Sequence, residues 1–582
     1  MIEKMTKYSF ILQSSRTDAF LSELQRLGVM DITRSEKPVD DESRRRFEEC
    51  GQMRKRIDFL RSGVCIGDED FDAAHKNLQD AENMLKTLLP WGIYEPSTVS
   101  DLAEKGVLLS FYRCPIKRFD PAWESAYALT VVGESEGNRY FVIAYTPDTV
   151  PDIPLVALQM PASSTMEAKE AVKEAELALH VREKELEAER AGIGTLEDEY
   201  RNALADLDRY LANVSAEKAS EERIDVMEGF APSSEDENLK SELDRMGVFY
   251  VTEAAGAGDR PPIKLKNNKF VSMFEVLTDM YGRPSYTEFD PTPFISVFFL
   301  LFFAMCMGDA GYGLILIIAG ALLKKVRSFS KLAPLVTALG AGTFVVGTLF
   351  HTFFSVDIAG WSWIPECVKN CMVPSKIAGY DGTMILALVI GIIHLCLAMV
   401  VRTVCALKNK GFLESLGTVG WTLFITGGVV TGALCLAGVI DSGTVKTVLC
   451  ILGAVSAVGI FILNDIHRNP LKNIGSGLWE TYNTVTGILG DVLSYLRLYA
   501  LGLAGSMLGL AFNNLGGMAL GDGGLGWIPF ILIVAVGHTL NIAMAVLGAF
   551  VHPLRLNFLE FFKNSGYEGS GRNYNPLTNK QS

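Results

Sequence analysis

The pattern of hydrophobic and polar positions changes abruptly near residue 290. Before it, short β-rich runs alternate with amphipathic stretches. Residues 6–35 and 222–253 each predict a strand, a helix and a strand, and further short strands are predicted at 107–114 and 128–145. Long helical stretches separate these α/β pieces. We therefore expect an α+β domain over residues 1–285, with α/β lobes joined by helices.

The long helical stretches cover residues 41–90 and 165–217. In the second, apolar residues recur every seven positions, at Val172, Leu179, Leu186, Ile193, Tyr200 and Leu207. That spacing supplies one seam of a heptad repeat, whereas the companion seam is weakly filled. The pattern favours a long antiparallel coiled coil between the two stretches, which would suit a force-bearing strut. An ordinary long helix on a globular domain is the alternative.

Long apolar runs dominate the second half of the chain. Eight segments are found, near 293–307, 310–325, 333–354, 382–402, 416–438, 444–464, 482–513 and 526–556. A spanning helix needs about 20 apolar residues, so the first two are short and the last two are long enough to tilt. We expect an all-α membrane domain of eight transmembrane helices over residues 286–582.

The distribution of Lys and Arg predicts the orientation of these helices. Positive residues gather in the short loops at 324–331, 402–410 and 468–472, which all lie on one side of an eight-span arrangement. The even number of spans places both termini on that side. No apolar core of a signal peptide is visible in MIEKMTKYSF. The sequence thus predicts a multi-pass protein of the cell membrane with both termini in the cytoplasm.

Composition excludes several classes of function. The net charge of -14 and the lack of a concentrated basic patch argue against a nucleic-acid partner. No P-loop of the form GxxxxGK[ST] occurs, so we do not expect this chain to hydrolyse ATP itself. No His and Cys cluster suggests a metal, and no cofactor is expected. Cys367 and Cys371 lie close together in a predicted external loop, where a disulfide and two free thiols are both compatible with the spacing.

The most informative residue is Arg497, near the middle of the seventh apolar segment. Inserting an arginine at mid-bilayer costs at least ~2.5–3.5 kcal/mol of free energy, so we expect Arg497 to have a function. Helical spacing places Thr486, Gly490 and Ser494 on its face, together with other small residues. A cation on a smooth surface suits a mobile carboxylate that passes by. A static pair with an internal acid is the alternative, although none lies on the same face within two turns.

Other polar residues of the last two segments are candidates for aqueous half-channels. Thr484, Gly487, Asp491 and Tyr495 form a second stripe on the seventh segment. The stripe fits a half-channel wall and local packing equally well. On the eighth segment His538, Asn541, His552 and Arg555 share one face. A satisfied core histidine is the alternative for His538, and a snorkelling anchor is the alternative for Arg555. Glu480 and Glu560, near helix ends, are expected to be solvated.

Five short motifs together resemble a known family. They are SYLRLYALGLA around Arg497, HPLRLNFLEFF around Arg555, RPSYTEFDPTPF at 283–294, MGDAGYG at 307–313 and VMEGFAP at 226–232. The chain is similar over nearly its whole length to subunit I, or subunit a, of V/A-type rotary ATPases of the bacterial or archaeal type. The resemblance implies that Arg497 is the essential arginine of the ion path and Arg555 the second arginine.

The resemblance also implies partners. They are a rotor ring of small membrane subunits, peripheral-stalk subunits, other subunits of the rotary ATPase, the lipid bilayer, and a transported H+ or Na+. This sequence departs from some eukaryotic members, because Ala545 and Gly505 stand where those members carry a glutamate and a histidine. A secondary transporter and a coiled-coil membrane receptor are the alternative functions. The first predicts inverted repeats and the second an external ligand domain, and neither feature is seen in the sequence.

Overall fold

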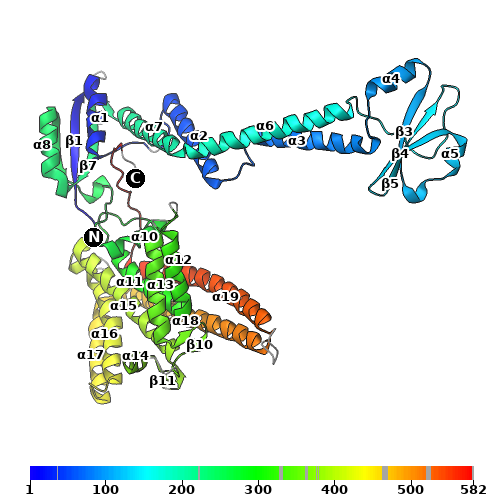
Figure 1. Ribbon diagram of the computed structural model, residues 1–582. Coiled ribbons are helices and arrows are strands. Elements are labelled where there is room, and N and C mark those ends of the chain that lie inside the picture. Colours follow the sequence, from blue (N-terminus) through cyan, green and yellow to red (C-terminus); the bar gives the residue numbers. More distant parts are fainter. Residues whose placement is uncertain are drawn as a thin grey trace. The chain divides into compact units, whose positions relative to one another are not determined.

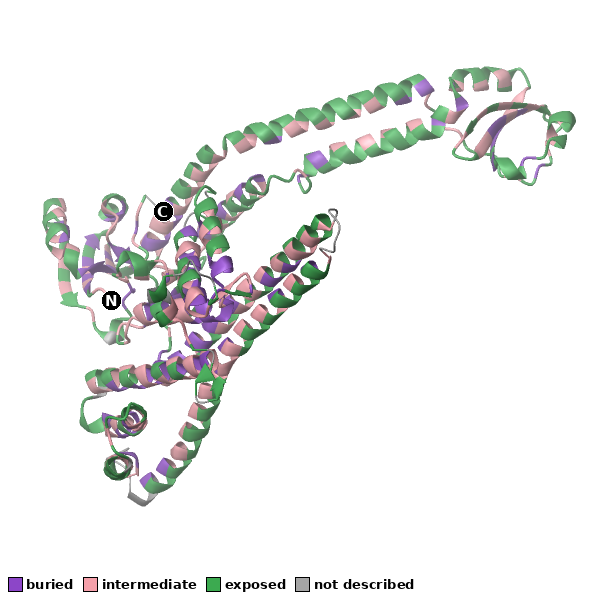
Figure 2. Ribbon diagram, turned by 60° about the horizontal axis from the view of Figure 1, so that its bottom comes forward, coloured by how far each residue is buried: buried purple, intermediate pink, exposed green. Residues whose placement is uncertain are grey.

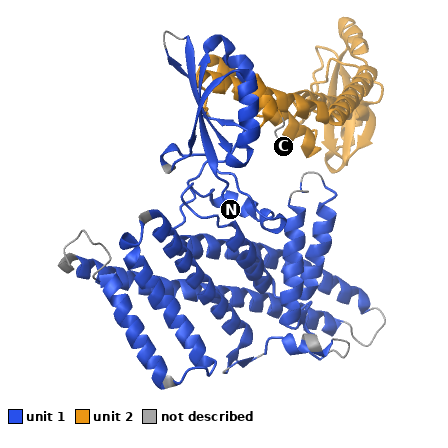
Figure 3. Ribbon diagram, turned by 90° about the vertical axis from the view of Figure 1, so that its left-hand side faces the viewer, with its two compact units in different colours: residues 1–20, 29–33, 217–576 blue, residues 21–28, 34–216, 577–582 orange. Residues whose placement is uncertain are grey.

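The structure is a computed structural model that describes residues 1–35, 37–219, 223–326, 329, 332–360, 365–374, 376–377, 379–461, 470–519 and 526–579. The chain forms two compact units (Figure 3). Unit 1 comprises Met1–Phe20, Val29–Thr33 and Glu217–Pro576, and unit 2 comprises Leu21–Gly28, Arg34–Ala216 and Leu577–Ser582. Each unit is described by itself below.

Unit 1 contains an antiparallel sheet built from both ends of the first half of the chain. Its strands are β1 (Met5–Gln13), β2 (Asp31–Ile32), β6 (Glu217–Ala219), β7 (Ile224–Pro232) and β8 (Phe249–Ala254), in the order β2-β7-β1-β8 with β6 also on β7. Helices α1 (Thr17–Leu27) and α8 (Asp236–Met246) connect strands. The two predicted strand–helix–strand units are thus confirmed. They pair through β1 and β7 because residues such as Phe10 and Met227 are buried there.

Unit 2 is centred on a pair of long helical stretches (Figure 1). The outgoing stretch is α2 (Asp41–Ser62) and α3 (Glu69–Leu88), and the returning stretch is α6 (Thr165–Ala191) and α7 (Ile193–Val214). Buried clusters join Cys50 to Leu207, Leu60 to Leu186, and Leu88 to Ala168. From one cluster to the next, the residue numbers of the outgoing stretch rise while those of the returning stretch fall. The two stretches therefore pack antiparallel, as predicted. The remaining surface of this helical pair is largely exposed (Figure 2).

A second sheet lies where the helical pair of unit 2 ends. Its antiparallel strands β3 (Leu108–Pro115), β5 (Asn138–Tyr145) and β4 (Ala128–Ser135) have the order β3-β5-β4, and the short helices α4 (Pro96–Glu104) and α5 (Ala122–Ala126) flank them. Trp91 follows α3 and meets Phe111 and Tyr140 edge-on, with ring centroids 5.2 and 5.3 Å apart. These aromatic contacts fix the lobe to the end of the helical pair.

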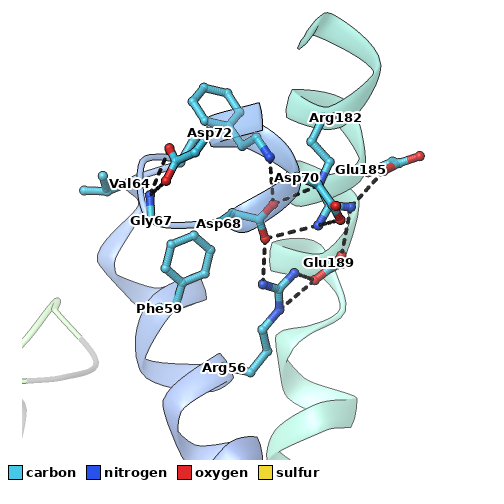
Figure 4. A network of polar contacts seen from close by, with 12 residues as sticks. Arg56, Phe59, Val64, Gly67, Asp68, Asp70, Asp72, Arg182, Glu185 and Glu189 are labelled. Carbon is cyan, nitrogen blue, oxygen red and sulfur yellow. Dashed lines mark hydrogen bonds and ion pairs between the residues drawn. The ribbon is translucent and has the colours of Figure 1, made fainter. Parts of the chain in front are cut away.

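The break between α2 and α3 is held by a network of charged residues (Figure 4). Gly63 and Gly67 adopt positive φ there. Asp68 caps α3 through the Phe71 amide and also accepts hydrogen bonds from Arg56 at 2.9 Å and Arg182 at 3.0 and 3.1 Å. Hydrogen bonds from Arg182, then from Arg56, hold the pKa of Asp68 well below its ordinary value although burial opposes that shift.

The second half of the chain forms helices at all eight predicted positions. They are α11 (Thr292–Met307), α12 (Ala310–Leu323), α13 (Ala333–Leu349), α15 (Gly382–Lys410), α16 (Leu416–Leu436), α17 (Ser442–Phe461), α18 (Pro470–Ala519) and α19 (Trp527–Arg555). Smaller elements are α9 (Lys269–Ser272), α10 (Glu275–Tyr281), β9 (Thr352–Phe353), β10 (Val356–Asp357), α14 (Glu366–Cys371), β11 (Lys376–Ile377), β12 (Tyr380–Asp381), a π-helical segment (Leu556–Phe561) and α20 (Phe562–Ser565).

The predicted number of eight spans is not confirmed. Among the described residues, five helices are long and apolar enough to cross a membrane: Gly382–Asn409, Leu413–Leu436, Gly443–Phe461, Asn473–Ala519 and Trp527–Ser565. The helices α11, α12 and α13 have only 16, 14 and 17 residues. The third segment was expected to reach residue 354, but the helix ends earlier because His351, Phe354 and Ser355 adopt positive φ in a turn.

The short helices pack against one another, although each keeps an exposed side, as at Val297, Ile318 and Val345. Phe299 and Phe302 of α11 are fully buried. Helices α12 and α13 approach so closely that a Cβ added at Gly313 would lie 2.4 Å from the backbone of Phe344. Of the charges used for the orientation, Arg327, Lys331 and Arg468 lie outside the described residues. Cys371 is a free, exposed thiol, and the side chain of Cys367 lies outside the described part.

Candidate functional site

Arg497 lies on α18 in a partly exposed position. Within the part of the chain that the structure describes, it forms no ion pair, and its Nη1 atom is buried without a hydrogen-bond partner. Its face of the helix is open, since Gly490 and Ala504 are exposed and Leu493 is 55% exposed. The static pair with an internal acid, the alternative drawn from the sequence, is therefore absent from the described residues. The arginine is free to bind an anion that approaches from outside.

Helix α19 runs antiparallel to α18 beside this arginine. A Cβ on Gly548 would lie 3.9 Å from Leu501, and Asn541 donates a hydrogen bond of 2.8 Å to the carbonyl oxygen of Gly505. His552 lies near enough to both Arg497 and Arg555 for their charges to act on it, and its Nδ1 atom is buried without a partner in the described residues. Asn541 and His552 are thus brought to the seam between α18 and α19, on the side of Arg497.

Arg555 stands at the end of α19. It is exposed and, like Arg497, forms no ion pair with the residues described. Its exposure is compatible both with a second arginine of an ion path and with the snorkelling anchor considered from the sequence.

A cavity of about 260 Å³ opens beside α18, and we call it the Asp491 cavity. Its polar lining residues are Arg402, Thr418, Glu480, Asn483, Thr484, Asp491, Lys563 and Asn564. Asp491 accepts a hydrogen bond of 2.8 Å from Asn564 and lies 4.0 Å from the Lys563 ammonium. Gly487 also lines the cavity, so three members of the predicted polar stripe face one hollow. Its mixed polar lining is suited to water and to ions.

Tyr495, the fourth member of that stripe, does not line the cavity. It is fully buried, and its hydroxyl lies 2.9 Å from Nδ1 of His394 on α15. Its ring packs against Gly391, where an added Cβ would lie 2.3 Å away. His394 itself is fully buried and stacks on Phe561 at 4.7 Å. Tyr495 therefore belongs to the packing between α15 and α18 and does not extend the polar lining formed by the other members of the stripe.

The hydroxyl groups on the arginine face bond to their own helix. Thr486 donates to the carbonyl oxygen of Tyr482 at 2.7 Å, and Ser494 donates to that of Gly490 at 3.1 Å. This is the local arrangement that polar residues in apolar helices commonly adopt. It leaves the oxygen lone pairs of both residues available to accept a hydrogen bond.

A second polar group lies farther along α18 and α19, and we call it the His538 cluster. It comprises Asp309, Tyr312, Ser355, Asn513, His538 and Asn541. The ring nitrogens of His538 lie 2.7 Å from the Tyr312 hydroxyl and 2.9 Å from Oδ1 of Asn513. Asn541, 1% exposed, donates to the same hydroxyl at 2.8 Å.

Asp309 organises the turn that closes this cluster. It caps α12 through the amides of Gly311 and Tyr312, and it also accepts from the amides of Phe354 and Ser355. Asp309 is thus the N-cap of α12. Tyr312 was not among the site residues predicted from the sequence, where its motif contributed only to the family resemblance. A tyrosine hydroxyl within an apolar span is the signal that could have found it.

The two polar regions lie on opposite sides of Arg497 along the helix. Asp491 precedes Arg497 by six residues, and Gly505, which bonds to Asn541, follows it by eight. At 1.5 Å per residue, these offsets correspond to about 9 Å and about 12 Å along the axis. The unpaired cation of Arg497 thus lies along α18 between the Asp491 cavity and the His538 cluster.

One acidic residue lies where the sequence did not predict it. Glu560 was expected to be solvated, but it is 4% exposed, because the π-helical segment turns it toward α18. No group of three or more His, Cys, Asp or Glu residues that could hold a metal is found in the described residues.

Comparison with known proteins identifies related sequences. Residues 162–336 match the V-type ATPase 116kDa subunit family. The "A-type ATP synthase subunit I" of Pyrococcus abyssi is 33% identical over 335 residues, which are 55% of this chain and 48% of that protein. The corresponding protein of Methanocaldococcus jannaschii is 31% identical, with 61% of this chain and 55% of that protein matched. The chain thus matches about half the length of these two relatives.

A bacterial relative is matched over a much longer stretch. The "V-type ATP synthase subunit I" of Chlamydia pneumoniae is 23% identical over 98% of this chain and 96% of its own length. Its extent agrees with the resemblance carried by the motifs around Arg497 and Arg555. The helices long enough to cross a membrane fit a membrane subunit. This chain is a membrane protein in which residues 162–336 match the V-type ATPase 116kDa subunit family, and it is similar to proteins named subunit I of V-type and A-type ATP synthases.

Proposed function

We propose that this chain is the stator subunit of a V/A-type rotary ATPase and forms its ion path against a rotor ring. The observation that carries the proposal is the unpaired, partly exposed Arg497 between the Asp491 cavity and the His538 cluster. The first 285 residues form a cytoplasmic domain whose antiparallel coiled coil and α/β lobes anchor peripheral stalks. Residues 286–582 form the membrane domain, with eight transmembrane helices and both termini in the cytoplasm.

The mechanism follows from the electrostatics of one fixed positive charge. A ring carboxylate crosses the lipid in its neutral or occupied form and then meets Arg497 on the open face of α18. A neighbouring cation lowers the pKa of a carboxyl group by ~1–3 units, so the ion is released. The guanidinium then pairs with the bare carboxylate until rotation carries it on. The same charge stops an ion from leaking directly between the two polar regions.

The half-channels are assigned from the two polar regions. Thr484 and Asp491 belong to one, and His538 and Asn541 belong to the other. Thr486, Ser494 and His552 lie near the arginine face, and Arg555 supplies the second positive charge. The transported ion is H+ or Na+, and ATP is made or hydrolysed in other subunits of the complex. The match of residues 162–336 to the V-type ATPase 116kDa subunit family argues against the secondary transporter and the receptor considered from the sequence.

Substitution of Arg497 tests this function. We expect Arg497→Ala to abolish ATP-driven ion transport in assembled complexes reconstituted in vesicles, and Arg497→Lys to restore little of it, because lysine lacks a planar, forked donor. Arg245→Ala removes an arginine that is 66% exposed on α8 and serves as the matched control. Transport by assembled Arg497→Ala complexes at the rate of this control would contradict the proposal.

A further inference from the structure

Glu560 is a buried acid that the mechanism above does not use. It is 4% exposed, and its Oε2 atom is buried without a hydrogen-bond partner among the described residues. Leaving a buried carboxyl oxygen unpaired costs free energy that a polar or apolar side chain of the same size would avoid. It also stands in a π-helical segment, a rare geometry that often marks functional sites. Both features call for a reason beyond packing.

The surroundings of Glu560 do not supply an ion-pair partner among the described residues. Arg555 lies near enough for its charge to act on Glu560, yet it forms no ion pair with it and is exposed. From α18, Asp491, Ser494 and Tyr495 face the carboxyl group. Asp491 brings a second negative charge near Glu560 and not a counter-ion. A fixed ion pair therefore does not explain the residue.

Ser494 can serve Glu560 in both of its protonation states. Its hydroxyl lies within hydrogen-bonding reach of the carboxyl group while it donates to the carbonyl oxygen of Gly490. In that position its lone pairs can accept the proton of a neutral Glu560. A rotation of the hydroxyl lets Ser494 donate to the ionised form instead. A side chain that has a partner in each state is suited to taking up and releasing a proton.

Glu560 also has neighbours both on the open helix face and in the Asp491 cavity. Asn564 donates hydrogen bonds both to Oδ2 of Asp491, in the cavity, and to the carbonyl oxygen of Glu560. On the other side, Ser494 precedes Arg497 by three residues, which is about 4.5 Å along the helix. Asn564 thus links the main chain at Glu560 to the cavity, and Ser494 stands about one helical turn before Arg497.

We propose that Glu560 carries protons between the rotor carboxyl group at Arg497 and the water of the Asp491 cavity. The inference rests on the proposed function and specifies the ion as H+. The ionised Glu560 takes the proton of the neutral rotor carboxyl group, and the rotor carboxylate that remains pairs with Arg497. Glu560 then gives this proton to a water molecule in the cavity and returns to its ionised form. The reverse sequence loads the rotor.

Substitutions in the assembled, reconstituted complex test this role. Glu560→Gln keeps the shape but cannot carry a proton, and we expect ATP-driven proton transport to fall by roughly 100-fold, as for loss of a proton-transferring group. Glu560→Asp keeps the acid and is expected to retain part of the transport, with a larger slowing in D2O than the wild type shows. Glu568→Gln changes an exposed glutamate eight residues later and is expected to transport at the wild-type rate.

The results separate this inference from the proposed function. If Arg497→Ala abolishes transport while assembled Glu560→Gln complexes transport like Glu568→Gln, Glu560 carries no protons and only the present inference is overturned. Normal transport by Arg497→Ala overturns the proposed function itself. A complex that pumps Na+ without proton movement also overturns the role given to Glu560. If Glu560→Gln fails to assemble, Ser494→Ala decides, because it keeps the acid and removes its partner: slowed transport supports the role, and a wild-type rate refutes it.

Discussion

The charged network at the break between α2 and α3 offers a quantitative test of what holds the helical pair together. Asp68 is its centre, since the side chain is 5% exposed and accepts hydrogen bonds from Arg56, from Arg182 and from the amide of Phe71. Replacement by asparagine keeps the shape and the capping oxygen. It removes the negative charge and turns one acceptor into a donor that faces two arginines.

The expected loss follows from the bonds that change. The oxygen Oδ2 accepts from Nη1 of Arg56 at 2.9 Å and from Nη2 of Arg182 at 3.1 Å. Hydrogen bonds to charged groups contribute about 1.5–3 kcal/mol each, and removing one partner of a buried ion pair costs about 3–5 kcal/mol. Glu189 still pairs with Arg56 after the substitution. We therefore expect Asp68→Asn to weaken the local structure by about 3 kcal/mol, the lower end of that range.

Hydrogen exchange of the full chain in detergent measures this local loss. Because every 1.4 kcal/mol changes an equilibrium tenfold, the amides at the start of α3 should exchange about 100-fold faster in Asp68→Asn. The control is Asp70→Asn, which removes an acid that is 79% exposed and 3.6 Å from Arg182. Such an exposed pair contributes at most about 1 kcal/mol. Equal acceleration in the two variants would refute the reasoning.

The dependence on pH provides a second measurement for the same residue. Hydrogen bonds from Arg182 lower the pKa of Asp68 in the folded state. A lowered folded-state pKa means that the stabilisation is complete above the unfolded value, about 3.9, and is lost as the pH falls through the folded value. The difference in exchange between wild type and Asp68→Asn should therefore be constant from pH 7 to about pH 5. It should shrink in more acidic solution.

Two further substitutions address packing. Gly391→Ala would place a Cβ 2.3 Å from the Tyr495 ring, so we expect about 1–3 kcal/mol of destabilisation and a lower melting temperature in detergent, whereas Gly428→Ala, with no atom within 4 Å, should stabilise α16 slightly. Leu186→Ala, at a fully buried seam position, should lower the local free energy of unfolding measured by hydrogen exchange by about 2–5 kcal/mol. Leu177→Ala, at a position that is 65% exposed, should change it little. Equal effects within either pair would contradict the packing described.

Local pattern was sufficient to predict many elements of the fold. The alternation of apolar residues predicted strands such as β1 and β7, and the seven-residue spacing that includes Leu186 and Leu207 predicted which side of the returning helices is buried. It was not sufficient for the ends of helices. The third apolar segment continues past Leu349 in composition, but the chain turns there because of its tertiary contacts with Asp309.

The sequence by itself determined that an arginine lies in an apolar helix beside small residues, because the cost of burying a charge and the 3.6-residue period need no tertiary information. Only the tertiary structure decided what surrounds it. Packing placed Asp491 in a cavity and buried Tyr495 against Gly391, although both belong to one stripe. It also buried Glu560, since the direction of a side chain near a helix end depends on the π-helical turn and on the neighbouring helix, which no local pattern records.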